Sequence, residues 1–304
     1  MDQPIVSLQQ VTKKFGRFEA LKDITFSVNQ GEVLGFIGPS GAGKSTTIRI
    51  LLGMLKKTSG EAQIFGQDVW QEDTKIHQRL SYVPGDVYLW PNLTGGEIID
   101  LLLRLNDQQR TKKTEELIQK FQLDPKKKAR TYSKGNRQKV ALIAALSQEA
   151  DLYIFDEPTS GLDPLNEITF QQEVIKLKAA GKSILLSSHI LSEVEKMCDR
   201  VVIIRDGEII ETGDLLSLRH LTRIKMTVVT KDSLAGIEKL PGIYNLKFTD
   251  SQQQRAELSV DREQMDTLML FLAERKLVDL TSTPPTLEDL FLHYYEKQGA
   301  DSHV

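Results

Sequence analysis

Residues 38–45 have the types and spacing of a phosphate-binding loop. They match the pattern G-x-x-x-x-G-K-[ST] in full. Glycines let successive backbone N–H groups point at phosphate oxygens, and a following helix adds the positive end of its dipole. Lys44 is expected to neutralise the β- and γ-phosphates, and Ser45 to hold Mg²⁺. The predicted nucleotide-binding residues of this loop are Gly38, Pro39, Ser40, Gly41, Ala42, Gly43, Lys44, Ser45 and Thr46.

Two carboxylates follow an apolar run at residues 152–155. An apolar strand that ends in acids places them at its carboxyl end, where α/β folds bind ligands. Asp156 is expected to support the Mg²⁺ coordination sphere, and Glu157 to act as general base on the attacking water. An isolated Asp-Glu pair would more simply be two solvated acids. The position downstream of the phosphate loop favours the catalytic interpretation.

The elements that must position these residues suggest an α/β fold. Residues 5–8 and 24–28 alternate polar and apolar positions, which is typical of strands in an antiparallel sheet. Residues 32–37 read as a buried strand that leads into the phosphate loop, and residues 46–55 as an amphipathic helix. Further strands are predicted at 152–155, 183–187 and 200–205. Helices predicted between consecutive strands of this series indicate a mostly parallel sheet.

Between about residues 86 and 148 the pattern predicts an inserted helical subdomain. The apolar period becomes helical from residue 97 onwards. One predicted apolar face contains Ile98, Leu101, Leu102 and Leu105, and another contains Leu117, Ile118 and Phe121.

The motifs stop near residue 218, so two domains are predicted, at 1–218 and 219–304. In the second, residues 224–229, 243–248 and 256–260 read as strands, and residues 262–275 and 286–295 as helices. We predict a small α+β accessory domain, possibly ferredoxin-like. No internal repeat is present, so a single nucleotide-binding unit is expected.

The charge, the cysteine content and the apolar runs of the sequence exclude several classes of protein. The net charge of −3 gives no global attraction to nucleic acid or anionic lipid. The single cysteine, Cys198, cannot form an internal disulfide and fits a reducing compartment. No apolar run reaches the ~20 residues of a membrane span, and no signal-peptide pattern opens the sequence. A cytoplasmic protein is expected, with any membrane role exerted through a partner.

Together these motifs resemble the ABC transporter ATPase family, in the family's order, across roughly the first 215 residues. The resemblance implies the ABC cassette fold: a mostly parallel core sheet, an antiparallel β subdomain and a helical subdomain. Residues 132–136 stand where the family has its LSGGQ signature. The resemblance implies that Ser133 and Gly135 reach across a dimer to ATP on the opposite subunit. Further implied roles are a D-loop at Asp163, a γ-phosphate contact at His189 and adenine stacking on Phe15.

The sequence departs from the family pattern at two motifs. In the signature Ser133, Lys134, Gly135 and Asn136, a lysine replaces a glycine and an asparagine replaces glutamine. Gly85 occupies the position of the Q-loop glutamine, and Asp86 is the nearest side chain that could substitute. Hydrolysis is still expected, with altered coupling at this loop.

The resemblance implies an ATP-hydrolysing subunit that pairs with a second copy and drives a separate membrane permease. Residues 285–291 resemble the tails of subunits that serve export permeases, which favours export and a place on the inner face of the membrane. The loop at 85–97, with Tyr88, Trp90 and Pro91, is expected to contact the permease. No nucleic acid partner is expected.

Three alternatives stay open from the sequence. A soluble ABC-type ATPase acting on nucleic acid or ribosomes would generally carry two cassettes or a long inserted coiled coil. A P-loop kinase would not require the signature or switch-histidine segments. A regulatory cassette that binds ATP but turns it over weakly would be consistent with Lys134 and Gly85.

Overall fold

The computed structural model describes residues 3–215, 217 and 223–283. The chain divides into two compact units, Met1–Gly213 and Asp214–Val304, five residues before the predicted boundary. The helix predicted at residues 286–295 lies outside the described residues. Within the described ranges, no helix has the length and apolar character needed to cross a membrane.

The centre of the first unit is a six-stranded sheet with the order β10-β9-β3-β8-β7-β6. Its strands are β3 (Val33–Ile37), β6 (Leu80–Val83), β7 (Leu152–Asp156), β8 (Ser183–Ser188), β9 (Arg200–Arg205) and β10 (Glu208–Asp214). The pairs β3–β8, β3–β9, β6–β7 and β7–β8 are parallel, as predicted. The strands β3, β7 and β8 are buried along their whole length, and their central residues are apolar, as expected for a sheet covered on both faces.

A second sheet, with the order β2-β1-β4-β5, is antiparallel. It contains β1 (Val6–Phe15), β2 (Phe18–Val28), β4 (Ser59–Ile64) and β5 (Gln67–Asp68). Helix α1 (Lys44–Leu51) contributes Ile48, Ile50 and Leu51 to one core with strands of both sheets. It starts two residues earlier than predicted and ends at Leu51 rather than at residue 55.

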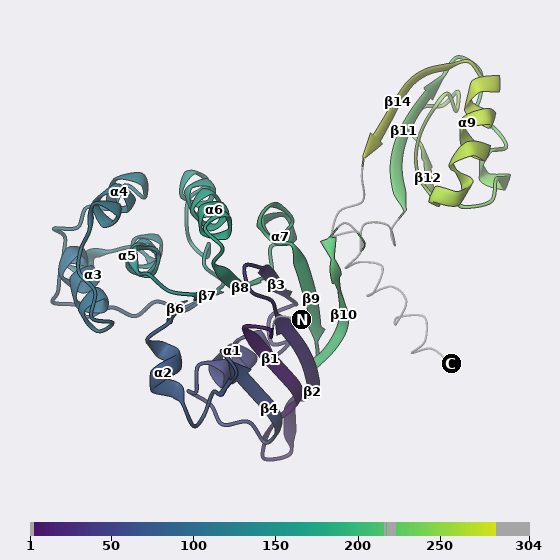
Figure 1. The fold of residues 1–304 in the computed structure, drawn as a ribbon. Helices are drawn as coiled ribbons and strands as arrows, with labels where there is room; N and C mark the ends of the chain where they lie inside the picture. The colour runs from purple at the N-terminus through teal and green to yellow at the C-terminus, as the bar shows by residue number, and fades with distance from the viewer. Residues whose placement is uncertain (1–2, 216, 218–222, 284–304) are drawn as a thin grey trace. The chain divides into compact units, whose positions relative to one another are not determined.

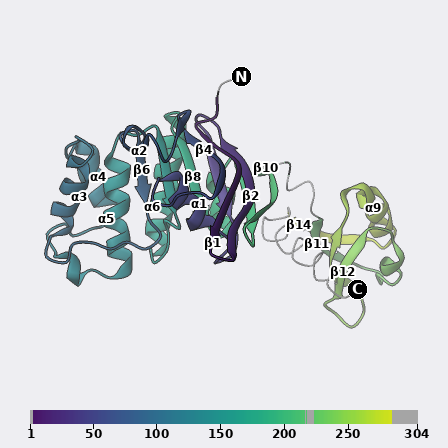
Figure 2. The ribbon, with the colours of Figure 1, turned by 90° about the horizontal axis from the view of Figure 1, so that it is seen from below.

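Helices α3 (Gly95–Arg104), α4 (Lys112–Lys120) and α5 (Lys134–Ser147) form the predicted helical part, to one side of the two sheets (Figures 1 and 2). The predicted apolar face of α3 is correct at Ile98 but wrong at Leu105. The buried apolar side chains of the helix are Ile98, Ile99 and Leu103, whereas Leu105 is 68% exposed. Ile99 and Leu103 are four residues apart and share one face, and Leu105, two residues after Leu103, lies on the opposite side.

Helices cover both faces of the parallel sheet, with α6 (Pro164–Ala179) and α7 (Leu191–Met197) opposite α1 (Figure 1). A short helix, α2 (Asp73–His77), precedes β6. Asp163 caps α6, because its Oδ1 accepts from the backbone N–H of Asn166 at 3.1 Å. Cys198, at the end of α7, is buried, and burial raises the pKa of its thiol. Such a protonated thiol is suited to packing rather than to reaction.

The second unit is a four-stranded antiparallel sheet, order β12-β13-β11-β14, packed against α9 (Met265–Glu274). The strands are β11 (Ile224–Thr230), β12 (Ile243–Phe248), β13 (Arg255–Val260) and β14 (Leu277–Thr283). The sequence did not predict β14. A ferredoxin-like fold has two crossover helices. Here the β11–β12 connection contains only a short 3₁₀ turn, Ile237–Lys239, so that description stays a prediction.

Candidate active site

The carboxyl ends of β3, β7 and β8 meet at one edge of the parallel sheet, where they form a cleft of about 740 Å³. It brings together residues predicted from three separate motifs. The predicted residues that line it are Pro39, Ser40, Gly41, Gly43, Lys44, Ser45, Thr46, Asp156, Glu157 and His189.

The phosphate loop turns sharply at Gly43 before α1 begins. The φ of Gly43 is +114°, and a Cβ there would stand 2.6 Å from Cδ2 of Leu21. Only glycine fits this combination of backbone angle and packing. No side chain caps α1, and its first turn contains no acidic residue. The free N–H groups of α1 are therefore directed at the cleft, as an anion site requires.

Lys44 is buried, with 7% exposure, at the floor of the cleft. Its Nζ donates to the carbonyl of Gly38 at 2.6 Å and to that of Pro39 at 3.2 Å. The same Nζ lies 3.4 Å from Oε1 of Glu157. A buried ammonium group needs such partners, since burying an unpaired charge is costly. Gly38 thus contributes its carbonyl beneath the loop, while Ala42 is 3% exposed and packs in the core.

Glu157 is aimed into the cleft by an unusual backbone conformation. Its φ is +50°, in the left-handed region, which costs a non-glycine residue roughly 1–2 kcal/mol. Its backbone N–H donates to the carbonyl of Ser187 at 3.1 Å, which holds this turn to β8. Oε2 of Glu157 lies 2.5 Å from Nδ1 of His189. The carboxylate is therefore held between the Lys44 ammonium and the His189 ring.

Asp156 is 5% exposed and accepts a hydrogen bond from Oγ of Ser187 at 2.5 Å. Ser45 and Asp156 both line the cleft and offer hard oxygen donors, which suit Mg²⁺. In the described part of the chain, no three His, Cys, Asp or Glu side chains gather into a metal cage. These residues fit a metal that is held mainly by substrate phosphates and water, with one or two protein ligands.

Three cleft residues had been given no role from the sequence: Arg49 on α1, Tyr82 on β6 and Pro84 after β6. Burial, together with the negative charge of nearby Asp156, raises the pKa of Tyr82 to about 12. Ser160, which also lines the cleft, begins the D-loop segment that the family resemblance implied at residues 160–163. Arg49 and Tyr82 reach the cleft through the packing of α1 and β6.

Some predicted residues do not line this cleft. Phe15 is 48% exposed, and Nζ of Lys13 lies 4.8 Å from its ring centroid. The signature residues begin α5, where Oγ of Ser133 caps the helix by accepting from the N–H of Asn136 at 3.3 Å. Nζ of Lys134 donates to Oγ of Ser160 at 2.8 Å. The roles predicted for Phe15 and for the signature therefore stay predictions.

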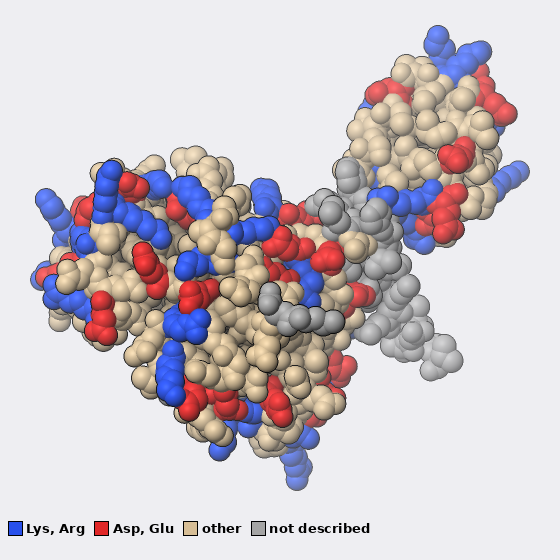
Figure 3. Space-filling view, in the orientation of Figure 1, with Lys and Arg blue, Asp and Glu red and all other residues tan. Residues whose placement is uncertain are grey.

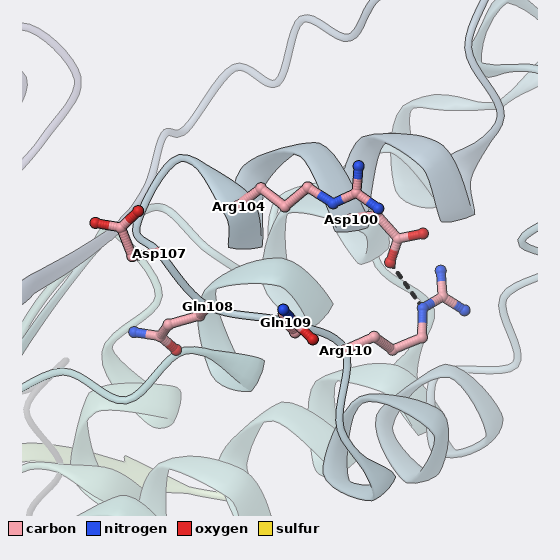
Figure 4. A pocket seen from close by; sticks show the side chains of 6 residues that line it. All are labelled: Asp100, Arg104, Asp107, Gln108, Gln109 and Arg110. Atoms are coloured by element: carbon pink, nitrogen blue, oxygen red, sulfur yellow. Dashed lines mark hydrogen bonds and ion pairs between the residues drawn. The ribbon is translucent and has the colours of Figure 1, made fainter.

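A second cavity, of about 570 Å³, lies beside the end of α3 and the loop that follows it (Figure 4). Its lining is polar, and Nε of Arg110 pairs with Oδ1 of Asp100 at 2.8 Å. Nη1 of Arg110 also donates to Glu115 at 3.0 Å. Arg110 is therefore paired with two carboxylates, and Arg104 is a second cation that lines the cavity. On the face seen in Figure 3, positive and negative side chains are interspersed over the first unit.

Sequence relatives span nearly the whole chain. Residues 21–160 match the ABC transporter family. An uncharacterised ABC transporter ATP-binding protein of Nostoc sp. is 34% identical over 93% of this chain and 85% of its own length. The linearmycin resistance ATP-binding protein LnrL of Bacillus subtilis is 31% identical over 95% of this chain and 97% of its own length.

Solved structures match a smaller part. The ATP-binding subunit of an ABC transporter has a TM-score of 0.66 at 31% identity, covering 71% of this chain and 92% of that structure. A dimeric ATP-binding cassette in a post-hydrolysis state, bound to ADP and Pi, has a TM-score of 0.63 at 28% identity. It covers 69% of this chain and 98% of its own. The chain therefore belongs to the ABC transporter ATP-binding proteins and is an ATP hydrolase of that family.

Proposed function

We propose that this chain is the energy-supplying subunit of an export system, and that ATP hydrolysis in its cleft drives a separate membrane permease. The observation that carries the hydrolytic part is the placement of Glu157 between Lys44 and His189 in one cleft. The proposal of export rests on the names of relatives, since LnrL is named for linearmycin resistance. Another relative, YbhF of Escherichia coli, is named as a probable multidrug transporter subunit.

We assign separate roles in ATP hydrolysis to the residues of the cleft. Residues 38–46 bind the phosphates through backbone N–H groups and the start of α1. Lys44, which pairs with Glu157, would turn to the β- and γ-phosphates of bound ATP. This exchange frees the Glu157 carboxylate to accept a proton from the attacking water. His189 orients Glu157 and contacts the γ-phosphate.

Ser45 and Asp156 hold Mg²⁺ in this proposal. When bound with ATP, Mg²⁺ neutralises charge that develops on the β- and γ-phosphates. Ser187 fixes the Asp156 carboxylate through its hydroxyl, so the carboxylate is oriented before the metal arrives.

A second copy of the chain completes the site. Ser133 and Gly135 start α5 and do not line the cleft of their own chain, which leaves them available to the ATP of a partner subunit. Asp163 caps α6 next to this surface, and Phe15 is exposed enough to stack on adenine. ATP binding would then close a homodimer, and hydrolysis would reopen it.

The loop between β6 and α3 is the proposed contact with the permease. Tyr88 is 90% exposed and Trp90 is 49% exposed, and Pro91 beside them is also exposed. Large exposed aromatic side chains are typical anchors at protein interfaces. Through this contact a cytoplasmic protein would be held at the inner face of the membrane.

A regulatory cassette with weak turnover is the second candidate, and Gly85 favours it. A Cβ at Gly85 would stand 3.2 Å from the carbonyl of Asp156, so this residue lies directly against the catalytic strand but has no side chain to offer. Asp86, the next residue, lines the cleft beside it. Turnover by the purified chain distinguishes an active subunit from a regulatory one.

The transport proposal is tested by purifying the full chain from detergent-solubilised membranes. We expect a multi-span membrane protein to be retained by the wild type and lost from the variant Trp90→Ser, because Trp90 does not line the ATP cleft. ATP turnover should be absent in Lys44→Ala but present in Trp90→Ser. Recovery of ribosomes or nucleic acid in place of a membrane protein would favour the soluble alternative.

A further inference from the structure

Lys134 joins the start of α5 to the loop that follows β7 in the same chain. Its Nζ donates to Oγ of Ser160 at 2.8 Å. Its aliphatic stem lies over Gly161, where an added Cβ would meet Cγ and Cδ of Lys134 at 3.3 Å. Gly135 brings the two segments closer still, since a Cβ there would stand 2.3 Å from the Gly161 carbonyl oxygen. The first turn of α5 therefore packs directly on this loop.

Two further side chains of α5 hold the same loop. Gln138 donates from Nε2 to the carbonyl of Pro158 at 2.9 Å and is 1% exposed. Nζ of Lys139 lies 3.6 Å from Oδ2 of Asp163. Gln138, four positions after Lys134, lies on the same side of the helix, and Lys139 is the next residue along. Three side chains of α5 thus contact residues 158–163.

This loop begins at the proposed catalytic base. The backbone N–H of Ser160 donates to the carbonyl of Glu157 at 3.2 Å, so a single turn separates the two residues. Glu157 is in the left-handed conformation, with φ +50°. A non-glycine residue persists in that region only when its surroundings hold it there. A bond that fixes Ser160 therefore also helps to fix Glu157.

The stability of α5 does not account for a lysine at this position. A positive charge in the first turn of a helix is unfavourable, because the helix dipole is positive at that end. The first turn of α5 contains no acidic residue, and it carries Lys134 and Arg137. The ammonium group of Lys134 therefore has a role outside its own helix.

We propose that Lys134 is a positioning residue for Glu157. Its bond to Ser160 ties the signature segment to the turn that carries the base, within one subunit. This inference rests on the proposed role of Glu157 as general base. It gives a function to the lysine that stands where the family resemblance predicted glycine.

The test compares Lys134→Met, Ser160→Ala and their double variant in the full-length chain. Lys134→Met keeps the stem over Gly161 and removes only the charged donor, while Ser160→Ala removes the same bond from the other side. Lys126→Met is the matched control, because Lys126 is also an exposed lysine of the helical part. Lys134→Arg retains a charged donor and should rescue.

Two quantities are measured. Amide hydrogen exchange of residues 157–163 without nucleotide should quicken by about tenfold in each single variant, as expected for loss of one hydrogen bond with a charged donor. The kcat for ATP should fall by roughly tenfold with KM unchanged, because the base is misplaced while nucleotide binding is intact. The double variant should be no worse than either single variant.

The proposal is overturned if exchange in the loop is unchanged, or if the effects of the two substitutions on kcat multiply. Either result would place the ammonium group's action elsewhere, such as on a phosphate bound by a second subunit. Failure of the proposed function itself is seen separately, as turnover that persists in Lys44→Ala. The exchange measurement does not depend on that outcome.

Discussion

The parallel sheet of the first unit and the antiparallel sheet of the second bury different kinds of side chain. The buried charged residues are Lys44, Lys139, Asp156, Glu173 and Glu193, all in the first unit. Among the described residues of the second unit, the buried polar side chains are Thr230 and Ser259, which are uncharged. Charges inside a protein cost free energy unless they are paired. The first unit is therefore the one that holds buried charged side chains, as an active site requires.

The topology explains why two of these charges, Lys44 and Asp156, line the same cleft. Parallel strands end at the same edge of their sheet, so residues after β3, β7 and β8 converge on one cleft. In the antiparallel unit, neighbouring strands end at opposite edges, and apolar residues such as Val228 and Leu258 fill one core against α9. We expect substitutions to affect turnover in the first unit and stability in the second.

The largest expected effect is that of Glu157→Gln. Removing a general base should lower ATP turnover by about 10²- to 10⁴-fold, while nucleotide still binds. The variant should therefore retain ATP, which chromatography of the nucleotide bound after a short incubation would detect.

Glu257→Gln, on an exposed position of β13, is the matched substitution in the second unit. It should leave turnover unchanged. Equal losses of activity in Glu157→Gln and Glu257→Gln would contradict the distinction between the two units. They would also contradict the assignment of Glu157 as the general base.

The next effect concerns stability. Leu272 is fully buried on α9, and Leu272→Ala should destabilise the second unit by about 2–5 kcal/mol, through lost burial and a residual cavity. Calorimetry should show the transition of that unit at lower temperature, with the other transition unmoved. If both transitions moved to lower temperature by the same amount, the two units would unfold as a single cooperative unit.

Asp86→Asn has a moderate expected effect. Because Asp86 lines the cleft beside Gly85, we expect its carboxylate to replace the missing glutamine near the metal and water. Its loss should weaken the Mg²⁺ dependence of ATP binding by roughly tenfold, as for other supporting residues of metal sites. Titration of nucleotide binding against Mg²⁺ measures this. An unchanged titration would mean that Asp86 has no part in the site.

The smallest effect is a pH dependence of stability at Glu193. This side chain is 5% exposed and accepts a hydrogen bond from Thr159 at 2.8 Å. Burial raises its pKa, so the folded chain binds this proton more tightly than the unfolded chain. Stability from this group is then full below the ordinary glutamate pKa and declines as pH rises through the raised value.

Glu193→Gln keeps an acceptor for Thr159 and cannot ionise. The variant should therefore equal or exceed the wild type in free energy of unfolding at neutral pH, with the difference shrinking in acid. Denaturant titrations at several pH values test this sign. A variant that loses stability only at neutral pH would show that the ionised carboxylate is favourable.

The sequence predicted the parts of the site that are encoded locally. The phosphate loop and the Asp156–Glu157 pair are short motifs joined to apolar strands, and the cleft contains them. Arg49 and Tyr82 were missed because they reach the cleft from the sides of α1 and β6, and no local pattern shows this. Strand β14 was missed because only Leu277 and Leu280 of its seven residues pack on the core.

The central claim is that two chains share each ATP site, and mixing two inactive variants tests it most directly. Lys44→Ala disables the phosphate loop and leaves the signature intact. Ser133→Asp leaves the loop intact, keeps a good helix cap and places negative charge where a phosphate would lie.

Steady-state ATP hydrolysis is measured for each variant alone and for an equal mixture. Random pairing makes half of the dimers mixed, each with one intact site, so the account predicts recovery of about a quarter of wild-type activity. A mixture as inactive as its components would contradict a shared site and place hydrolysis, if any, within the single chain.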